Sequence, residues 1–208
     1  AEGIDNFHLA ASAAQRRERV EQLMTMCGLY PEQAGNYPHQ FSGGQRQRIG
    51  IARALATDPE FIVCDEAVSA LDVSIQAQII NLLKDLQEEL SLTYLFISHD
   101  LNIVHFISDE IIVMYLGQIV ERGTMEKVYQ NRAHPYTKAL FSATPAFTPA
   151  EKQRKNRMIL EGDVPSPVDP PQGCRFRGRC PYASKRCEEE PGWHEVESDH
   201  FVRCHLFD

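Results

Sequence analysis

The chain has 208 residues, of which 43% are hydrophobic, and it carries a formal net charge of -8. This composition excludes a disordered, collagen-like or low-complexity chain, and it allows one substantial core with a small appended module. The acidic balance excludes a general nucleic-acid binder, because a phosphate backbone requires a basic surface. The basic run from Lys152 to Arg157 is most simply a solvated linker.

Neither a secretory signal nor a run of about 20 apolar residues is found in the sequence. We therefore expect any membrane association to be peripheral and to depend on partner subunits.

Apolar residues recur at helical spacing in parts of the chain and form short continuous runs in others. They predict helices over residues 13–28, 42–56 and from Asp72 or Ser74 to about 90, with a shorter helix at 101–106. They predict strands over residues 61–64, 93–97, 110–115 and 118–121. The first of these strands is wholly apolar, which is typical of a strand buried on both faces of a parallel sheet. The element order predicts an α/β fold with helices packed on a mostly parallel sheet.

The C-terminal third has a different composition. Residues 144–173 are rich in proline and predict a linker or an extended covering segment. The last 35 residues contain four cysteines and few helix or strand signals. We expect them to form a small module that is not held together by an apolar core.

A glycine-containing helix start lies at Ser42 to Gln45, within the sequence Phe41-Ser42-Gly43-Gly44-Gln45. One interpretation is a well-capped helix, because Ser and Gln three residues apart form a capping box. The other is an anion site, because two glycines allow a ligand to approach free N–H groups at the positive end of the helix dipole. This segment alone does not decide between them.

Acidic residues follow the apolar strand, at Asp65 and Glu66. Such a position is where α/β sheets place their ligands. One acid can hold Mg²⁺ and the next can orient or deprotonate an attacking water. The alternative is a pair of exposed loop acids. His99 follows the next strand and can reach the same crevice, although a lone histidine is more often structural, and Asp100 is expected to cap the helix that follows.

These segments together resemble the ATPase domain of ABC transporters, over residues 10 to 145. Four motifs occur in the family's order: the signature motif at Ser42 to Gln45, the Walker B strand at Phe61 to Glu66, the D-loop at Ser69 to Asp72, and the switch histidine at His99. The resemblance implies a P-loop NTPase-like core, truncated at its N-terminus, with a helical signature subdomain.

The resemblance also implies a role for each matched residue. Ser42 and Gly44, with Gly43 and Gln45 beside them, would contact the γ-phosphate of ATP that is bound to the opposite subunit. Asp65 would hold Mg²⁺, and Glu66 would act as the general base. Asp72 would connect the two sites of a dimer, and His99 would sense the γ-phosphate.

Longer strings resemble the peptide-importer branch of this family. They are Asp65 to Asp72 followed by Val73-Ser74-Ile75-Gln76, His134-Pro135-Tyr136-Thr137, Pro165-Ser166-Pro167, and the cysteine strings at Gly173-Cys174 and Arg179-Cys180-Pro181. We expect three segments: a helical subdomain at 1–57, a part of the nucleotide-binding core at 58–133, and a C-terminal extension at 134–208. The branch also includes nickel importers, so the solute stays open.

One family motif is missing from the chain: no G-x-x-x-x-G-K followed by Ser or Thr occurs. Without this loop and its Lys, the β- and γ-phosphates lose their main binding site. We therefore expect the isolated chain to bind ATP weakly and to hydrolyse it negligibly.

Six cysteines are present, and they divide into two groups. Cys27 and Cys64 have apolar neighbours and are expected to be small core residues. Cys174, Cys180, Cys187 and Cys204 are separated by five, six and sixteen residues. These four could hold a [4Fe-4S] cluster, as the resemblance to peptide-importer ATPases implies, could ligate zinc, or could be reduced and unligated. The nearby His194, His200 and His205 are spare ligands, but we expect them to be surface residues.

Three functions follow from these observations. The first is an ATPase subunit that works with a second ABC ATPase subunit and with membrane permease subunits, at the cytoplasmic face of the inner membrane. The second is a non-catalytic module that supplies the signature motif in trans or binds a regulatory metal. The third, a soluble ABC protein of DNA repair or translation, is disfavoured because neither a coiled-coil insertion nor a tandem domain is visible.

Overall fold

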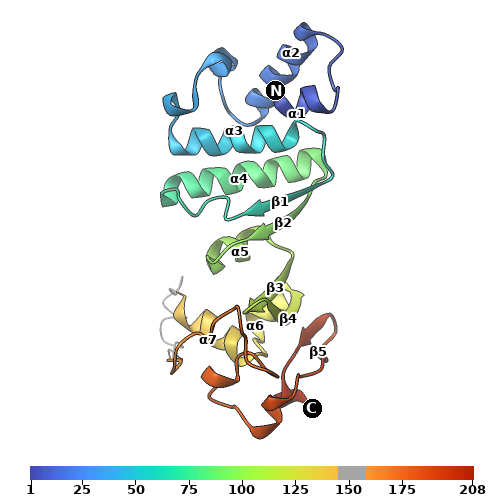
Figure 1. The fold of residues 1–208 in the computed structure, drawn as a ribbon. Helices are drawn as coiled ribbons and strands as arrows, with labels where there is room; N and C mark the ends of the chain where they lie inside the picture. Colours follow the sequence, from blue (N-terminus) through green and yellow to red (C-terminus); the bar gives the residue numbers. More distant parts are fainter. Residues whose placement is uncertain (145–157) are drawn as a thin grey trace. The chain divides into compact units, whose positions relative to one another are not determined.

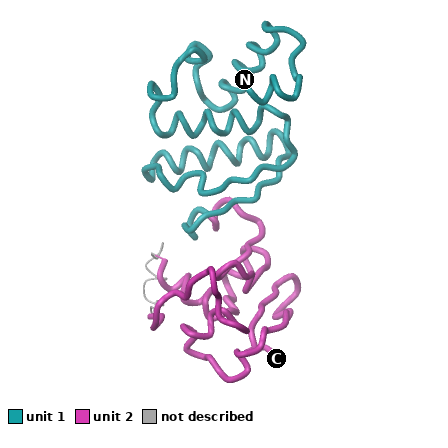
Figure 2. The backbone as a smooth tube through the Cα atoms, viewed as in Figure 1, with its two compact units in different colours: residues 1–103 teal, residues 104–208 magenta. Residues whose placement is uncertain are grey.

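The structure is a computed structural model that describes residues 1–144 and 158–208. It consists of two compact units, residues 1–103 and residues 104–208 (Figures 1 and 2). The basic run from Lys152 to Arg157 lies outside the described residues. The division into three segments at residues 57 and 133 stays a prediction. Within the described ranges, no helix is both long enough and apolar enough to span a membrane.

The first unit is mainly helical. Its helices are α1 (Glu2–Asn6), α2 (Ala13–Met26), α3 (Gly43–Leu55) and α4 (Val73–Leu90), with short 3₁₀ helices at Pro31–Gly35 and Pro38–Gln40. The unit boundary falls within α5 (Leu101–Ile107). The helices expected at 13–28, 42–56 and from Asp72 onward are confirmed, and α1 was not expected.

The end of α2 is joined to α3 by a hydrogen bond. Arg48 Nη1 of α3 donates to the carbonyl oxygen of Cys27 over 2.8 Å. A cation at this position is favourable, because the last carbonyls of a helix are unpaired and carry its negative dipole end. Gly28 follows with a φ of 69°, which ends the helix in the left-handed conformation. The bond fixes the end of α2 against the second turn of α3.

Strands β1 (Phe61–Asp65) and β2 (Thr93–Ile97) form a parallel pair, in which Asp65 lies opposite Ile97. Helix α4 lies along one face of this pair (Figure 1), and Tyr94 Oη donates to the Leu83 carbonyl of α4 over 3.0 Å. The other face leaves about half of the surface of four apolar side chains exposed. They are Phe61, Val63, Leu95 and Ile97.

The expectation that the first strand is buried on both faces is therefore wrong for the described chain. An apolar run indicates that both faces of a strand can be buried, whereas in the described chain α4 covers only one face of β1. Parallel pairing of the first two strands is confirmed. Cys27 and Cys64 are buried, as expected, and burial raises the pKa of each thiol to about 11.

The second unit contains a four-stranded antiparallel sheet. Its strands are β3 (Glu110–Tyr115), β4 (Gln118–Thr124), β5 (His194–Glu197) and β6 (His200–Val202), in the order β3-β4-β6-β5. The expectation of a mostly parallel sheet is wrong for this unit. Leu116 and Gly117 both have positive φ, 46° and 74°, so they form a two-residue turn that can only reverse the chain.

Helices α6 (Met125–Gln130) and α7 (Pro135–Ala143) pack with this sheet around a cluster of aromatic rings. The Tyr115 ring centre lies 4.7 Å from that of Tyr136 and 5.2 Å from that of Phe176. Phe176 is 1% exposed, so a residue of the cysteine-containing tail lies in the core of the unit. The tail is therefore part of this unit's core, contrary to the expected coreless module.

A buried carboxylate connects three segments of the second unit. Glu121 of β4 is 0% exposed. Its two oxygens accept the N–H groups of Ala133 and His134, each over 2.8 Å, and Oε1 lies 2.8 Å from His200 Nε2 of β6. These hydrogen bonds compensate for the burial of the charged group. His200 is thus buried, and the expectation that it is a surface residue is wrong.

Candidate functional site

The start of α3 is closed by a reciprocal capping box. Ser42 Oγ accepts the N–H of Gln45 over 3.3 Å, and Gln45 Oε1 accepts the N–H of Ser42 over 2.9 Å. The first bond within the helix backbone runs from the Arg46 N–H to the Ser42 carbonyl. In the described part of the chain no acceptor is found for the N–H groups of Gly43 and Gly44. The capping interpretation is confirmed, and it leaves two N–H groups directed out of the helix tip.

The carboxyl ends of β1 and β2 bring Asp65, Glu66 and His99 to one edge of the sheet. Asp65 is the last residue of β1, and the Glu66 N–H donates to the Ile97 carbonyl over 3.0 Å. Glu66 has a φ of 46°, a left-handed conformation that is costly for a residue with a side chain. This conformation turns the chain sharply at the end of the strand.

Glu66 and His99 are in direct contact. Glu66 Oε1 lies 3.3 Å from His99 Nδ1, and the two side chains are 54% and 74% exposed. An exposed pair of this kind contributes little to stability. Its groups remain available to a ligand, and a carboxylate beside an imidazole can accept or orient a proton.

The segment that follows Glu66 is a tight turn ending in a capped helix. Ser69 donates its N–H and its Oγ to the Glu66 carbonyl. Asp72 is the cap of α4, and its Oδ1 accepts from Ser74 Oγ over 2.7 Å and from the Ile75 N–H over 3.0 Å. The Ser74 hydroxyl, followed by the Ile75 N–H, lowers the pKa of Asp72 below its usual 3.8. In this structure the Asp72 carboxylate is therefore bound by its own helix.

Asp100 also acts as a cap. Its Oδ1 accepts the N–H of Asn102 over 2.9 Å, in the first turn of α5. This is the structural role expected for it, so His99 is left as the functional candidate of this loop.

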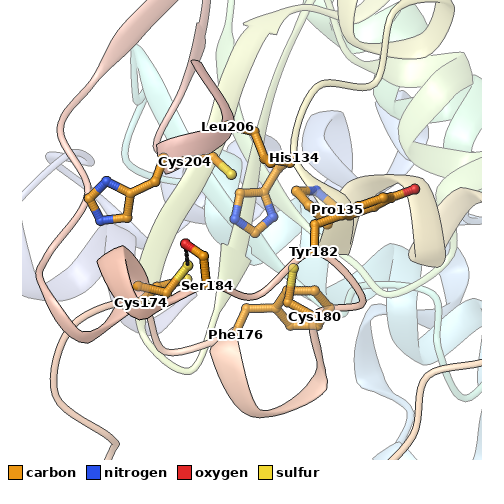
Figure 3. A pocket seen from close by; sticks show the side chains of 11 residues that line it. His134, Pro135, Cys174, Phe176, Cys180, Tyr182, Ser184, Cys204 and Leu206 are labelled. Carbon is orange, nitrogen blue, oxygen red and sulfur yellow. Dashed lines mark hydrogen bonds between the residues drawn. The ribbon is translucent and has the colours of Figure 1, made fainter. Parts of the chain in front are cut away.

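The four C-terminal cysteines of the second unit line one cavity of about 90 Å³. Figure 3 shows the side chains around it, with contributions from the start of α7 and from the tail. The lining residues are His134, Pro135, Cys174, Phe176, Cys180, Tyr182, Ser184, Cys187, Cys204, His205 and Leu206. Ser184 Oγ lies 3.8 Å from Cys187 Sγ. The sequence indicated that the cysteines could form a site, but it did not indicate that His134 or Tyr182 would lie beside them.

All four cysteines are free thiols in the structure. Burial is the main cause that raises the pKa of Cys174 and Cys180, and it raises the pKa of Cys204 to about 11. Neighbouring thiols add to the increase, because a second negative charge nearby disfavours the thiolate. Among residues 1–144 and 158–208, no three His, Cys, Asp or Glu side chains are grouped closely enough to hold a metal ion.

Two family models match the chain. Residues 3–69 match the ABC transporter family, and residues 120–187 match the C-terminal region of oligopeptide/dipeptide transporters. The first match includes the capped tip of α3 and the acidic edge at Asp65 and Glu66. The second includes most of β4, the Glu121 carboxylate and three of the four cysteines.

Several curated relatives are more than half identical to the chain. The oligopeptide transport ATP-binding protein AppF of Bacillus subtilis is 53% identical over 97% of the chain and 62% of the relative. The oligopeptide transport ATP-binding protein OppF of Escherichia coli is 52% identical over 98% of the chain and 61% of the relative. The chain thus spans about three-fifths of the length of these relatives.

Solved structures of ATP-binding cassettes share part of the fold. The ADP conformation of MJ1267, an ATP-binding cassette of an ABC transporter, is 27% identical with a TM-score of 0.53, covering 61% of this chain and 49% of its own. CbiO1 of Clostridium perfringens, part of the ABC transporter complex cbiONQ, is 26% identical with a TM-score of 0.55, covering 62% and 51%. The predicted α/β cassette fold is confirmed. The resemblance to ATP-binding subunits of ABC transporters is therefore confirmed over residues 3–69, and the resemblance to the oligopeptide/dipeptide branch over residues 120–187.

Proposed function

We propose that the chain supplies the signature motif and the catalytic edge of an ATPase subunit that energises the import of di- or oligopeptides. The contact between Glu66 and His99 at the acidic edge carries this proposal. Relatives named for oligopeptide transport support the choice of solute. Because the chain spans only about three-fifths of those relatives, the activity concerns the complete subunit.

In this proposal, two nucleotide-binding domains close around two ATP molecules. The tip of α3, with Ser42, Gly43, Gly44 and Gln45, binds the γ-phosphate of the nucleotide held by the opposite subunit, using N–H groups at the positive helix end. Asp65 holds Mg²⁺, which neutralises charge on the phosphates when it is bound.

Glu66 accepts a proton from the attacking water, and His99 contacts the γ-phosphate. Glu66 Oε1 and His99 Nδ1 are 3.3 Å apart, so the group that accepts the proton and the group that contacts the phosphate lie next to each other at the sheet edge. Asp72 connects the two sites. To reach across a dimer, its carboxylate must exchange the bonds from Ser74 and Ile75 for bonds from the partner.

The proposed partners are a second ABC ATPase subunit and membrane permease subunits. The proposed location is the cytoplasmic face of the inner membrane, with attachment through those permeases. The absence of the G-x-x-x-x-G-K sequence from this chain supports the proposal that the chain alone binds ATP weakly and does not turn it over.

The test is ATP hydrolysis and uptake of a labelled oligopeptide by the reconstituted transporter that contains this sequence. Glu66→Gln should abolish both activities while the complex still assembles. Glu60→Gln, at the residue directly before β1, is the matched control and should leave both unchanged. Uptake that survives Glu66→Gln contradicts the proposal. Mg²⁺-dependent turnover by the isolated chain, lost in Glu66→Gln, contradicts the proposed inactivity of the chain.

We further propose that Cys174, Cys180, Cys187 and Cys204 hold a [4Fe-4S] cluster. The observation that supports it is the cavity that all four line. A single zinc ion requires all four sulfurs within about 2.3 Å of one metal atom. A four-iron cluster lets the sulfurs lie farther apart, because each thiolate binds its own iron. Bound iron would also stabilise thiolates whose burial otherwise keeps them protonated.

The cluster is tested by iron and sulfide analysis and by the visible spectrum of anaerobically purified chain. We expect about four iron atoms per chain and a broad visible absorbance, both lost in Cys180→Ser. Cys27→Ser, in the first unit, is the matched control and should retain them. A colourless, iron-free chain with a full thiol titre contradicts the cluster, and one zinc per chain without iron supports zinc instead.

A further inference from the structure

The tip of α3 packs directly on the first turn of α4. A Cβ atom added to Gly44 would lie 2.6 Å from Ile75 Cγ2, closer than real Cβ contacts come. The same atom added to Gly43 would lie 3.5 Å from Leu71 Cδ2, which is an ordinary van der Waals contact. The two neighbouring glycines therefore differ: only the second has no room for a side chain within its own subunit.

Ile75 cannot move aside easily. Its Cγ2 is bonded directly to Cβ, and a β-branched residue in a helix has one strongly preferred χ1 rotamer. Its backbone is also fixed, because the Ile75 N–H donates to Asp72 Oδ1 in the first turn of α4. The clash at Gly44 is thus with a stiff part of the structure rather than with a flexible side-chain end.

We propose that Ile75 is a positioning residue, which sets the signature tip of α3 against the Asp72-capped start of α4. Gly44 is then required for packing inside its own subunit as well as for approach to a nucleotide. This inference rests on the proposed function for its catalytic consequence, but not for the contact itself. A displacement of the D-loop turn at Asp72 would be transmitted through Ile75 to the tip at Ser42 to Gln45.

The contact is tested in the 208-residue chain without nucleotide. Gly44→Ala should lower the Tm by about 3–10 °C, the usual effect of overpacking in a chain of this size, and should speed hydrogen exchange in the first turns of α3. Gly43→Ala is the matched control and should change the Tm by less than about 2 °C. Equal effects of the two substitutions would overturn the proposal.

Two substitutions of Ile75 separate its Cγ2 methyl group from its bulk. Ile75→Leu removes the second branch at Cβ and should restore at least half of the Tm lost in Gly44→Ala. Ile75→Val keeps both branches at Cβ and should restore none of it. If Ile75→Leu gives no rescue, or Ile75→Val rescues as well, Ile75 is not the group that excludes a side chain at position 44.

The positioning role is tested in the complete transporter, with native Gly44. Ile75→Ala should lower kcat/KM for ATP about tenfold, because the loosened tip no longer meets the nucleotide of the opposite subunit. Leu86→Ala, which removes a buried side chain farther along α4, should leave kcat and KM unchanged below its unfolding temperature. Unchanged kinetics in Ile75→Ala overturn the positioning role. If the native complex has no ATPase activity, the proposed function fails. The Tm comparison of Gly44→Ala with Gly43→Ala still tests the contact between Gly44 and Ile75.

Discussion

Glu66 Oε1 lies 3.3 Å from His99 Nδ1, although 33 positions separate these residues in the chain. The contact arises because each residue follows a strand of the same parallel pair, and parallel strands place their carboxyl ends at one edge. Both side chains are exposed, so the pair is a poor source of stability. We therefore expect the pair to contribute to ligand binding or catalysis rather than to folding.

His99→Ala should therefore affect activity far more than stability. In the complete transporter we expect kcat for ATP hydrolysis to fall by at least about 10²-fold, because a positioned contact to the transferred phosphate is lost. The free energy of unfolding of the chain should change by less than about 0.5 kcal/mol. Steady-state kinetics and thermal unfolding measure the two effects.

The control for this prediction is His8→Asn, at an exposed histidine of the first unit whose left-handed φ of 54° an asparagine tolerates. It should leave kcat and KM unchanged. A loss of activity in His99→Ala that parallels a loss of folded protein would contradict a catalytic contribution.

Asp72→Asn should remove a pH-dependent part of the stability. The pKa of Asp72 is lowered in the folded chain, chiefly by the Ser74 hydroxyl, so the unfolded chain binds the proton more readily. The carboxylate therefore stabilises α4 above about pH 4, and this contribution is lost as the pH falls below 3.8. Asparagine keeps the cap but not the charge.

The Tm difference between the native chain and Asp72→Asn should thus be largest near pH 7 and should become smaller as the pH falls below 3.8. Asp85→Asn, at an exposed position later in α4, is the control and should show no such trend. A difference in Tm that is constant over this pH range would show that the Asp72 charge is not involved.

The sequence predicted the parts of the fold that depend on local pattern. The start of α3 could be predicted because Ser42 and Gln45 satisfy each other's N–H groups within four residues. The long helix α4 could be predicted because its buried residues repeat on one face. Helix α7 was missed, although Pro135 at its first position is a recognised start signal.

The remainder depends on contacts between distant segments. Nothing local indicates that Glu121 is buried, since a glutamate is normally exposed and its partner His200 lies 79 residues later. Strands β5 and β6 are only four and three residues long, and they exist because β6 pairs with β4 and β5 pairs with β6. At the tip of α3 and the acidic edge, the sequence indicated Ser42 to Gln45, Asp65, Glu66 and His99. The exclusion of a side chain at Gly44 by Ile75 could be found only in the structure.

Gly173→Ala should disrupt the cysteine cavity. Gly173 has a φ of 72°, and a Cβ there would lie 2.5 Å from the Cys187 carbonyl oxygen, to which the Cys174 N–H donates over 3.0 Å. Left-handed strain and a backbone clash together should cost more than about 2 kcal/mol. The expected result is a lower Tm and faster reaction of the tail thiols with a disulfide reagent.

Gly178→Ala is the matched control for this prediction, because a Cβ at that position meets no atom within 4 Å. It should change neither the Tm nor the thiol reactivity. Similar behaviour of the two alanine variants would contradict the close approach of the Gly173 and Cys187 backbones.

Glu121→Gln should destabilise the second unit, because the amide has only one oxygen for the three donors around it. The N–H groups of Ala133 and His134 and the ring of His200 would compete for that oxygen, while the new NH₂ group would face a donor. Leaving one buried donor unpaired should cost about 1–3 kcal/mol, measured by denaturant unfolding of the chain. Glu110→Gln, at an exposed position of β3, should cost less than about 0.5 kcal/mol. Equal stability of the two variants would mean that the buried carboxylate contributes no more than an exposed one.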